Sequence, residues 1–102
     1  MTTYNIHILP AAMDDLNRIQ DRLLSLTTVK SALSVTDSIL DRIEILGEYP
    51  DSGSYTPDEF LNKMGYRKLV CSKQYVAIYR HIGNEVFIYH IADTRTDYPS
   101  LF

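Results

Sequence analysis

The opening residues of the chain alternate apolar and polar side chains. In residues 4–9, Tyr4, Ile6 and Ile8 fall at every second position, which is the period of a β-strand with one covered face. At Pro10 the period changes to that of a helix, and proline suits the first helical turn because its missing N–H would have no partner there. The pattern therefore predicts a strand that leads directly into a helix.

The first helical stripe extends over residues 11–26. Its apolar members recur at steps of four and three, which place them on one face of a helix. We expect Asp14 and Asp15 in the first turn, where carboxylates interact favourably with the helix dipole. The stripe consists of Ala12, Leu16, Ile19, Leu23 and Leu26.

A second helix is predicted over residues 29–46. Thr27 and Thr28 interrupt the first stripe and offer a capping hydroxyl, while Gly47 and Pro50 are typical of a helix end. Two amphipathic helices with so short a link are expected to form an antiparallel hairpin. The second stripe consists of Val29, Leu33, Thr36, Leu40 and Ile43, flanked by Ala32, Ile39 and Leu46. The leucines expected in the core are Leu16, Leu23, Leu33 and Leu40.

Three further strands are predicted in the second half of the chain. They cover residues 65–71, 74–82 and 85–92, which are rich in β-branched and aromatic side chains. Gly83 and Asn84 tolerate the positive φ of a two-residue hairpin turn. The three strands should form an antiparallel meander.

Residues 51–58 form a turn-rich connection, and residues 60–64 are ambiguous, with a short helical turn as one interpretation. The order strand, two-helix hairpin, three-stranded antiparallel meander predicts an α+β fold. We expect the helices on one face of the sheet and alternate meander side chains on a partly open opposite face.

The bulk composition limits the possible classes. A chain of 102 residues fits one domain, here residues 1–102, and it contains no apolar run of membrane-spanning length. Residues 1–4 lack the features of a signal peptide, so we expect a cytoplasmic protein. Cys71 has no cysteine partner and is expected to be a small core residue. No cluster has metal-ligand spacing, and we expect no cofactor.

Charge is divided unevenly along the chain. The net charge of −3 argues against a general nucleic-acid binder, yet residues 60–102 carry six basic and three acidic side chains, whereas residues 1–59 carry four and ten. One interpretation is an ordinary solvated surface. The other is a basic working face on the sheet.

Several short motifs occur in a definite order along nearly the whole chain. They are Pro10-Ala11-Ala12 with Asp15, Leu16 and Ile19; Ile43, Leu46 and Pro50; Tyr66-Arg67; Tyr75 to Arg80; and Arg95-x-Asp97-Tyr98. In this order and spacing the chain resembles the RelE/ParE superfamily toxins of bacterial type II toxin–antitoxin systems.

The resemblance implies a growth-inhibiting toxin, often linked to plasmid stabilisation, that a cognate antitoxin binds and holds inactive. It implies contact with operator DNA only through that antitoxin, and no membrane partner. RelE-like members cleave mRNA in the ribosome, whereas ParE-like members poison DNA gyrase. A degenerate toxin that retains only antitoxin binding is a third alternative.

For the ribonuclease alternative, the resemblance assigns catalytic roles to Arg67, Arg95 and Tyr98, with Lys68 as a further second-strand cation. Such chemistry needs a proton acceptor, a proton donor and cations around the reacting phosphate. The family's third-strand arginine falls on Val76, which can do none of this. The sequence therefore favours the gyrase alternative slightly over the ribonuclease.

Other polar residues have structural interpretations. Arg95 and Asp97 could form an internal ion pair or contact a partner, and Arg80 is expected to be a solvated charge at a strand end. Tyr75 and Tyr79 share a strand face and are expected at the edge of the core. The three histidines, which have no acidic neighbour in sequence to orient them, are expected to be structural. They are His7, His81 and His90.

Overall fold

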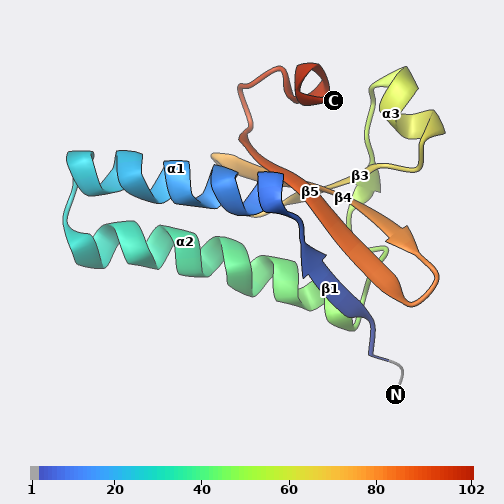
Figure 1. Cartoon of the computed structure of the whole chain (residues 1–102), viewed down its shortest axis with the longest axis horizontal. Helices are drawn as coiled ribbons and strands as arrows, with labels where there is room; N and C mark the ends of the chain where they lie inside the picture. The colour runs from blue at the N-terminus through green and yellow to red at the C-terminus, as the bar shows by residue number, and fades with distance from the viewer. Residues whose placement is uncertain (1–2) are drawn as a thin grey trace.

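The computed structural model describes residues 3–102. Met1 and Thr2, which belong to the segment expected to lack a signal peptide, lie outside the described residues. A five-stranded sheet, in the order β1-β5-β4-β3-β2, carries two long helices on one face (Figure 1). The elements are β1 (Asn5–Ile8), α1 (Pro10–Leu26), α2 (Val29–Glu44), η1 (Ile45–Gly47), β2 (Ser54–Tyr55), α3 (Glu59–Lys63), β3 (Arg67–Val70), β4 (Tyr75–Ile82), β5 (Glu85–Asp93) and η2 (Tyr98–Leu101). The predicted α+β order of strand, helix pair and meander is confirmed.

Helix α1 begins at Pro10, as the sequence predicts, and α2 begins after Thr28, whose hydroxyl accepts a hydrogen bond from the Ser31 N–H at 3.1 Å. The first turn of α1 contains no acidic residue, so the expected placement of Asp14 and Asp15 there is wrong. Because the helix already starts at the proline, both aspartates lie in its second turn. Asp15 is buried, while Asp14 is exposed.

The predicted buried face of α2 is wrong by a small rotation. Leu33 and Leu40 are 41% and 38% exposed, whereas Ala32 and Ile39 from the expected flank are buried. Both sets follow steps of three and four, and their faces differ by less than a third of a turn, so periodicity alone cannot choose between them. The buried face of α2 consists of Ala32, Thr36, Ile39 and Ile43.

The sheet contains two pairings that the sequence did not predict, because the short β2 lies in the connection expected to be only turns and pairs with β3, and β1 pairs with β5. β1 lies parallel to β5, with Ile6 opposite Val86, whereas every other strand pair is antiparallel. The two-residue turn at Gly83 is confirmed, and its φ of +60° explains the glycine. The register shifts between Ile78 and Tyr79, where Tyr89 is an extra residue on the β5 side of the pair.

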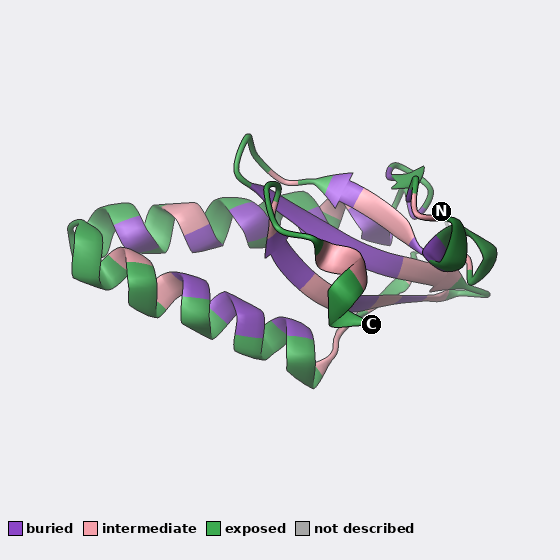
Figure 2. Cartoon of the chain, turned by 90° about the horizontal axis from the view of Figure 1, so that it is seen from above, coloured by how far each residue is buried: buried purple, intermediate pink, exposed green. Residues whose placement is uncertain are grey.

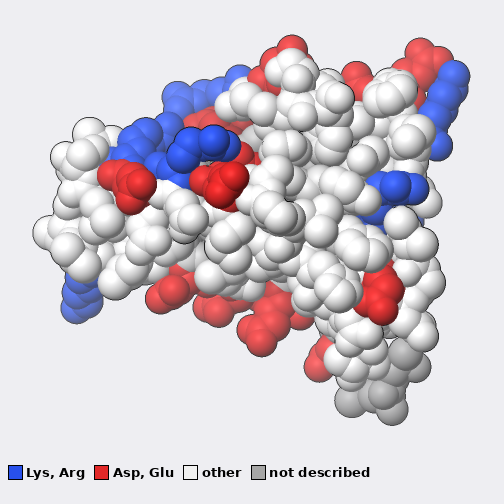
Figure 3. Space-filling model, viewed as in Figure 1, with Lys and Arg blue, Asp and Glu red and all other residues white. Residues whose placement is uncertain are grey.

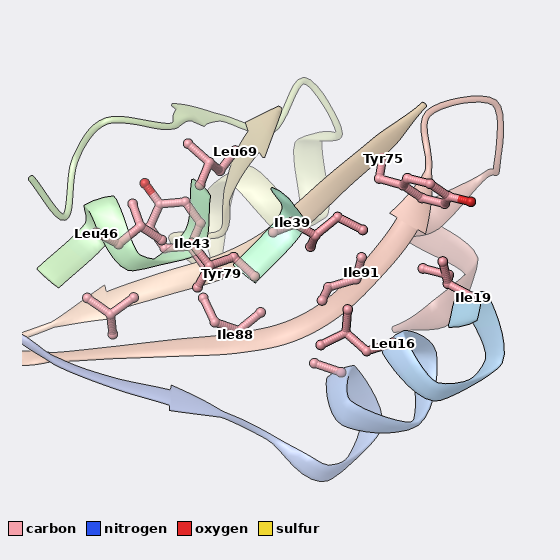
Figure 4. Packing of buried hydrophobic residues seen from close by; sticks show 13 residues of the cluster. Leu16, Ile19, Ile39, Ile43, Leu46, Leu69, Tyr75, Tyr79, Ile88 and Ile91 are labelled. Atoms are coloured by element: carbon pink, nitrogen blue, oxygen red, sulfur yellow. The ribbon is translucent and has the colours of Figure 1, made fainter. Parts of the chain in front are cut away.

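Between the helix pair and the sheet lies the larger cluster of buried side chains, which we call the helix-side core. Figure 4 shows Leu16, Ile39 and Ile88 pointing from α1, α2 and β5 into this layer. Burial of such aliphatic side chains is the main favourable contribution to folding. The buried members are Ala12, Leu16, Ile19, Ile39, Ile43, Leu46, Leu69, Tyr75, Ala77, Tyr79, Val86, Ile88 and Ile91.

The opposite face of the sheet carries a second, smaller cluster, which we call the tail-side cluster. Its buried members are Leu61, Tyr66, Val76, Ile78 and Ala92, with Tyr89 and Tyr98 packed against them. The face is partly open, as expected, since Val70, which pairs with Val76 of the cluster, is 55% exposed. The short helix α3 and the C-terminal segment 94–102 cover much of it, and Figure 2 shows that segment crossing over the buried strands.

Candidate functional site

Arg67 lies on the helix side of β3 and is held by the connection before β2. Its Nη1 donates a hydrogen bond to the Gly53 carbonyl at 2.8 Å, and its Nε lies 3.6 Å from Oδ1 of Asp51. The guanidinium also stacks over the Tyr55 ring, 4.0 Å from its centroid. With only 17% of the side chain exposed, Arg67 is engaged in holding residues 51–55 against the sheet.

Tyr79 reinforces the same connection from β4. Its hydroxyl donates to the Pro50 carbonyl at 2.8 Å and accepts the Gly53 N–H at 2.9 Å. A Cβ on Gly53 would approach the Lys68 carbonyl oxygen to 2.5 Å, so only glycine fits there. Burial raises the pKa of the Tyr79 phenol, which keeps the hydroxyl protonated as a donor.

Val76, where the family pattern has a cation, is 3% exposed and packs in the tail-side cluster. Lys68 points to this face too, because it pairs with Ile78 of the same cluster. Arg67 and Lys68 therefore lie on opposite faces, as neighbours on a strand must. The basic residues of this region do not converge, since Lys63 pairs with Glu59 on α3 and Arg80 stacks on Tyr66.

Arg95 lies just beyond the end of β5 and is 83% exposed. It pairs with Asp93 through Nε at 3.2 Å, and not with Asp97 as the sequence suggested. The tight turn at Thr94 brings Arg95 back onto the carboxylate two residues before it, and the Arg95 N–H donates to the same oxygen. Hydrogen bonds from Arg95 hold the pKa of Asp93 well below its usual range.

Tyr98 lies on the other side of the sheet from Arg67, against the tail-side cluster. Burial, followed by the nearby Asp58 carboxylate, raises the pKa of its phenol. Arg95 follows the end of β5, where Asp93 pairs with Tyr75 of β4. Arg67 pairs with Tyr79, and the four residues between Tyr75 and Tyr79 separate the two positions by about 13 Å along β4. The structure does not bring Arg67, Arg95 and Tyr98 to one place, and their catalytic roles stay a prediction.

Each histidine contacts a carboxylate from a distant part of the chain. His7 lies 2.6 Å from Glu85, His81 lies 2.9 Å from Asp51, and His90 lies 2.8 Å from Asp15. The hydrogen bond from His7 lowers the pKa of Glu85. These pairs could not be predicted from the sequence because each one joins different elements.

Asp15 is the polar residue whose role sequence reasoning missed. Its Oδ2 accepts the backbone N–H of Ile91 at 3.0 Å, and its Oδ1 accepts a hydrogen bond from Arg18. β1 pairs with β5 only as far as Ile88, so the edge of β5 beyond that residue needs another acceptor. The signal available in the sequence was the position of Asp15 on the apolar face of the helix, three residues after Ala12 and four before Ile19.

Cys71 is half-buried, and burial raises the pKa of its thiol to about 11. It is therefore almost entirely protonated at neutral pH and unsuited to nucleophilic attack. Within residues 3–102, no three or more His, Cys, Asp or Glu side chains are grouped closely enough to hold a metal ion. None of the helices in that range combines the length and apolarity that crossing a membrane requires.

Comparison with known families identifies the chain. Residues 6–98 match the model of the ParE toxin of the type II toxin–antitoxin system parDE, and the chain belongs to this family. It is a toxin of the ParE/RelE type. A search of curated proteins finds no match.

Solved structures agree with the fold. The chromosomal ParDE system from P. aeruginosa contains a chain that is 23% identical, with 91% of this chain and 98% of that chain covered and a TM-score of 0.76. A chain of the toxin–antitoxin complex RelBE2 from Mycobacterium tuberculosis is 20% identical, with 89% of this chain and 98% of that chain covered and a TM-score of 0.58. At these identities the likeness concerns the fold.

Proposed function

We propose that this chain is a ParE-like toxin that poisons DNA gyrase and that a cognate antitoxin holds inactive. The observation that carries the gyrase assignment is the separation of the residues a ribonuclease would need. Arg67 is engaged with residues 51–55 on one face, and Tyr98 packs on the other. A gyrase poison needs no catalytic group of its own, because the trapped topoisomerase damages the DNA.

A ribonuclease site would need several cations around one phosphate. On β4, the position of the family's arginine is occupied by Val76, which is apolar and buried. Arg95 is already paired with Asp93. The net charge of −3 also disfavours tight binding to ribosomal RNA, because such binding depends on the release of counterions by many basic side chains.

The antitoxin can dock on apolar side chains of the helix pair that are left exposed. Leu33 and Leu40, seven residues apart on α2, and Met13 and Leu24 on α1 are each 38–43% exposed. A partner helix uses such a stripe through apolar side chains at i, i+4 and i+7. Amide hydrogen exchange of free and antitoxin-bound toxin would test this, and unchanged protection along residues 11–46 would contradict it.

Expression in a bacterial host tests the toxin assignment. Induction of the chain alone should arrest growth, and co-expression of the protein encoded beside it should relieve the arrest. Normal growth at high soluble expression would instead favour a degenerate toxin that retains only antitoxin binding.

A purified system separates the two targets. The toxin should stabilise cleaved DNA–gyrase complexes and leave ribosome-bound mRNA intact. mRNA cleavage at the ribosomal A site, reduced about ten- to a hundredfold or more by Arg95→Ala, would overturn the gyrase assignment. Lys30→Ala, which removes an exposed charge from α2, is the matched control for a nonspecific effect of charge.

A further inference from the structure

Beside α1, a pocket of about 270 Å³ opens between this helix and the C-terminal segment. Its floor is apolar, with Ile19 from α1 and Ile91 from β5, and Leu101 closes one side. Two arginines of α1, Arg18 and Arg22, line its rim. Figure 3 shows basic side chains gathered over α1 next to the C-terminal segment, whereas acidic ones follow the outer edge of α2.

The charges at the rim are only partly neutralised. Arg18 is paired with Asp15, and Arg95 with Asp93, another residue of the pocket wall. Arg22 instead donates a hydrogen bond to the Tyr75 hydroxyl at 2.7 Å. Among residues 3–102 no carboxylate lies within ion-pair distance of Arg22, so this guanidinium retains unused donors and an uncompensated charge.

We propose that this pocket binds a peptide segment with an acidic side chain next to an aliphatic one. The carboxylate would pair with Arg22, for which the planar guanidinium is well suited, and the aliphatic group would cover Ile19 and Ile91. The proposal goes beyond the toxin's target and antitoxin and depends on neither.

The composition of the pocket favours a peptide over other anions. A nucleic-acid strand would leave the apolar floor of Ile19 and Ile91 without an apolar partner. A volume of about 270 Å³ is also slightly below the range of about 300–1,000 Å³ typical of sites for whole small molecules. One or two peptide side chains match both the size and the chemistry.

Selection from a displayed library of random 12-residue peptides against the full chain tests the proposal. We expect enriched peptides to carry Asp or Glu beside Leu, Ile or Val. A synthetic copy of the best peptide should shift the NMR signals of Ile19, Ile91 and Leu101. Its affinity should fall about ten- to a hundredfold for Arg22→Gln and remain unchanged for Lys30→Gln, which removes a charge outside the pocket.

A second variant guards against a folding defect in the first. Leu101→Ala removes apolar surface from a side chain that is 43% exposed, so the fold should persist while the preference for the aliphatic neighbour weakens. Enrichment of peptides without acidic residues, equal binding to Arg22→Gln, or failure to enrich any peptide would overturn the proposal. So would an RNA oligonucleotide that displaces the peptide and binds more tightly, because that would indicate a phosphate site.

Discussion

The two faces of the sheet are covered in different ways. Among residues 3–102, two long helices, α1 and α2, enclose the helix-side core of thirteen buried residues, whereas the five-residue α3 and the segment after β5 enclose a tail-side cluster of five. Short elements gain little from their own helical hydrogen bonds and depend on the side chains that dock them. The helix side should therefore unfold only with the whole protein, and the tail side should open locally.

Two isoleucines with the same burial make this comparison measurable. Ile88 in the helix-side core and Ile78 in the tail-side cluster are both 0% exposed. We expect Ile88→Ala to lower the free energy of unfolding by about 3–5 kcal/mol, because the long helices cannot move into the cavity. Ile78→Ala should lower it by about 2–3 kcal/mol, since α3 and the tail can collapse or detach. Urea unfolding of both variants measures the difference, and equal losses would contradict the two-sided picture.

The next largest effect is expected where a polar side chain joins the helices to the sheet. Asp15→Ala leaves the buried Ile91 N–H without its acceptor and removes the partner of His90. A loss of about 2–4 kcal/mol should follow. Asp15→Asn keeps one acceptor oxygen and should cost less. Hydrogen exchange at the Ile91 amide would report the change directly, and full protection of that amide in Asp15→Ala would show that its protection does not depend on this carboxylate.

The sequence predicted what depends on short-range periodicity. The helix pair, the Thr28 cap, the hairpin at Gly83 and the antiparallel meander all follow from spacing and turn chemistry. The buried face of α2 did not follow. A rotation of less than a third of a turn exchanges Leu33 for Ala32, and only contact with the sheet selects between them.

Long-range pairings could not be predicted at all. The parallel pairing of β1 with β5 joins residues about 80 positions apart, and no local pattern encodes it. The same holds for the candidate site. Sequence reasoning placed Arg67 on a strand, but its contacts with Gly53 and Asp51 depend on how residues 51–55 return to the sheet. The pairing of Arg95 with Asp93 depends on one turn, and Asp97 was an equally plausible partner.

Tyr79 tests how firmly the helix-side core extends to the connection before β2. Tyr79→Phe removes hydrogen bonds to Pro50 and Gly53 and should lower the free energy of unfolding by about 1–3 kcal/mol. Exchange of the Gly53 amide should accelerate in the variant. Retention of its protection would mean that Arg67 alone holds this segment in place.

The same tyrosine predicts a dependence on alkaline pH. Because burial raises the pKa of Tyr79 in the folded state, its stabilising contribution is complete below its ordinary value of 10.0 and is lost as pH rises through the higher folded pKa. Unfolding of the wild type should therefore become easier above pH 10, and Tyr79→Phe should lack part of this loss. Identical alkaline profiles would exclude Tyr79 as its source.

The smallest effect is expected at the outer end of the tail side. Phe102 is 41% exposed and contacts the Tyr66 ring at 4.7 Å and the His90 ring at 5.1 Å between centroids. An aromatic pair contributes about 0.5–1.5 kcal/mol, and a half-exposed pair should lie at the lower end. Phe102→Ala should therefore change the free energy of unfolding by less than about 1 kcal/mol.

Local exchange is the more sensitive measurement for this variant. Amides of residues 94–102 should exchange faster in Phe102→Ala, while those of β4 and β5 keep their protection, because the tail opens without the sheet. Phe60→Ala, which alters a 64% exposed ring on α3, is the matched control and should leave the tail unchanged. A loss of stability in Phe102→Ala as large as that of Ile78→Ala would mean that the tail unfolds together with the sheet. The tail-side cover would then be as much a part of the cooperative unit as the two long helices.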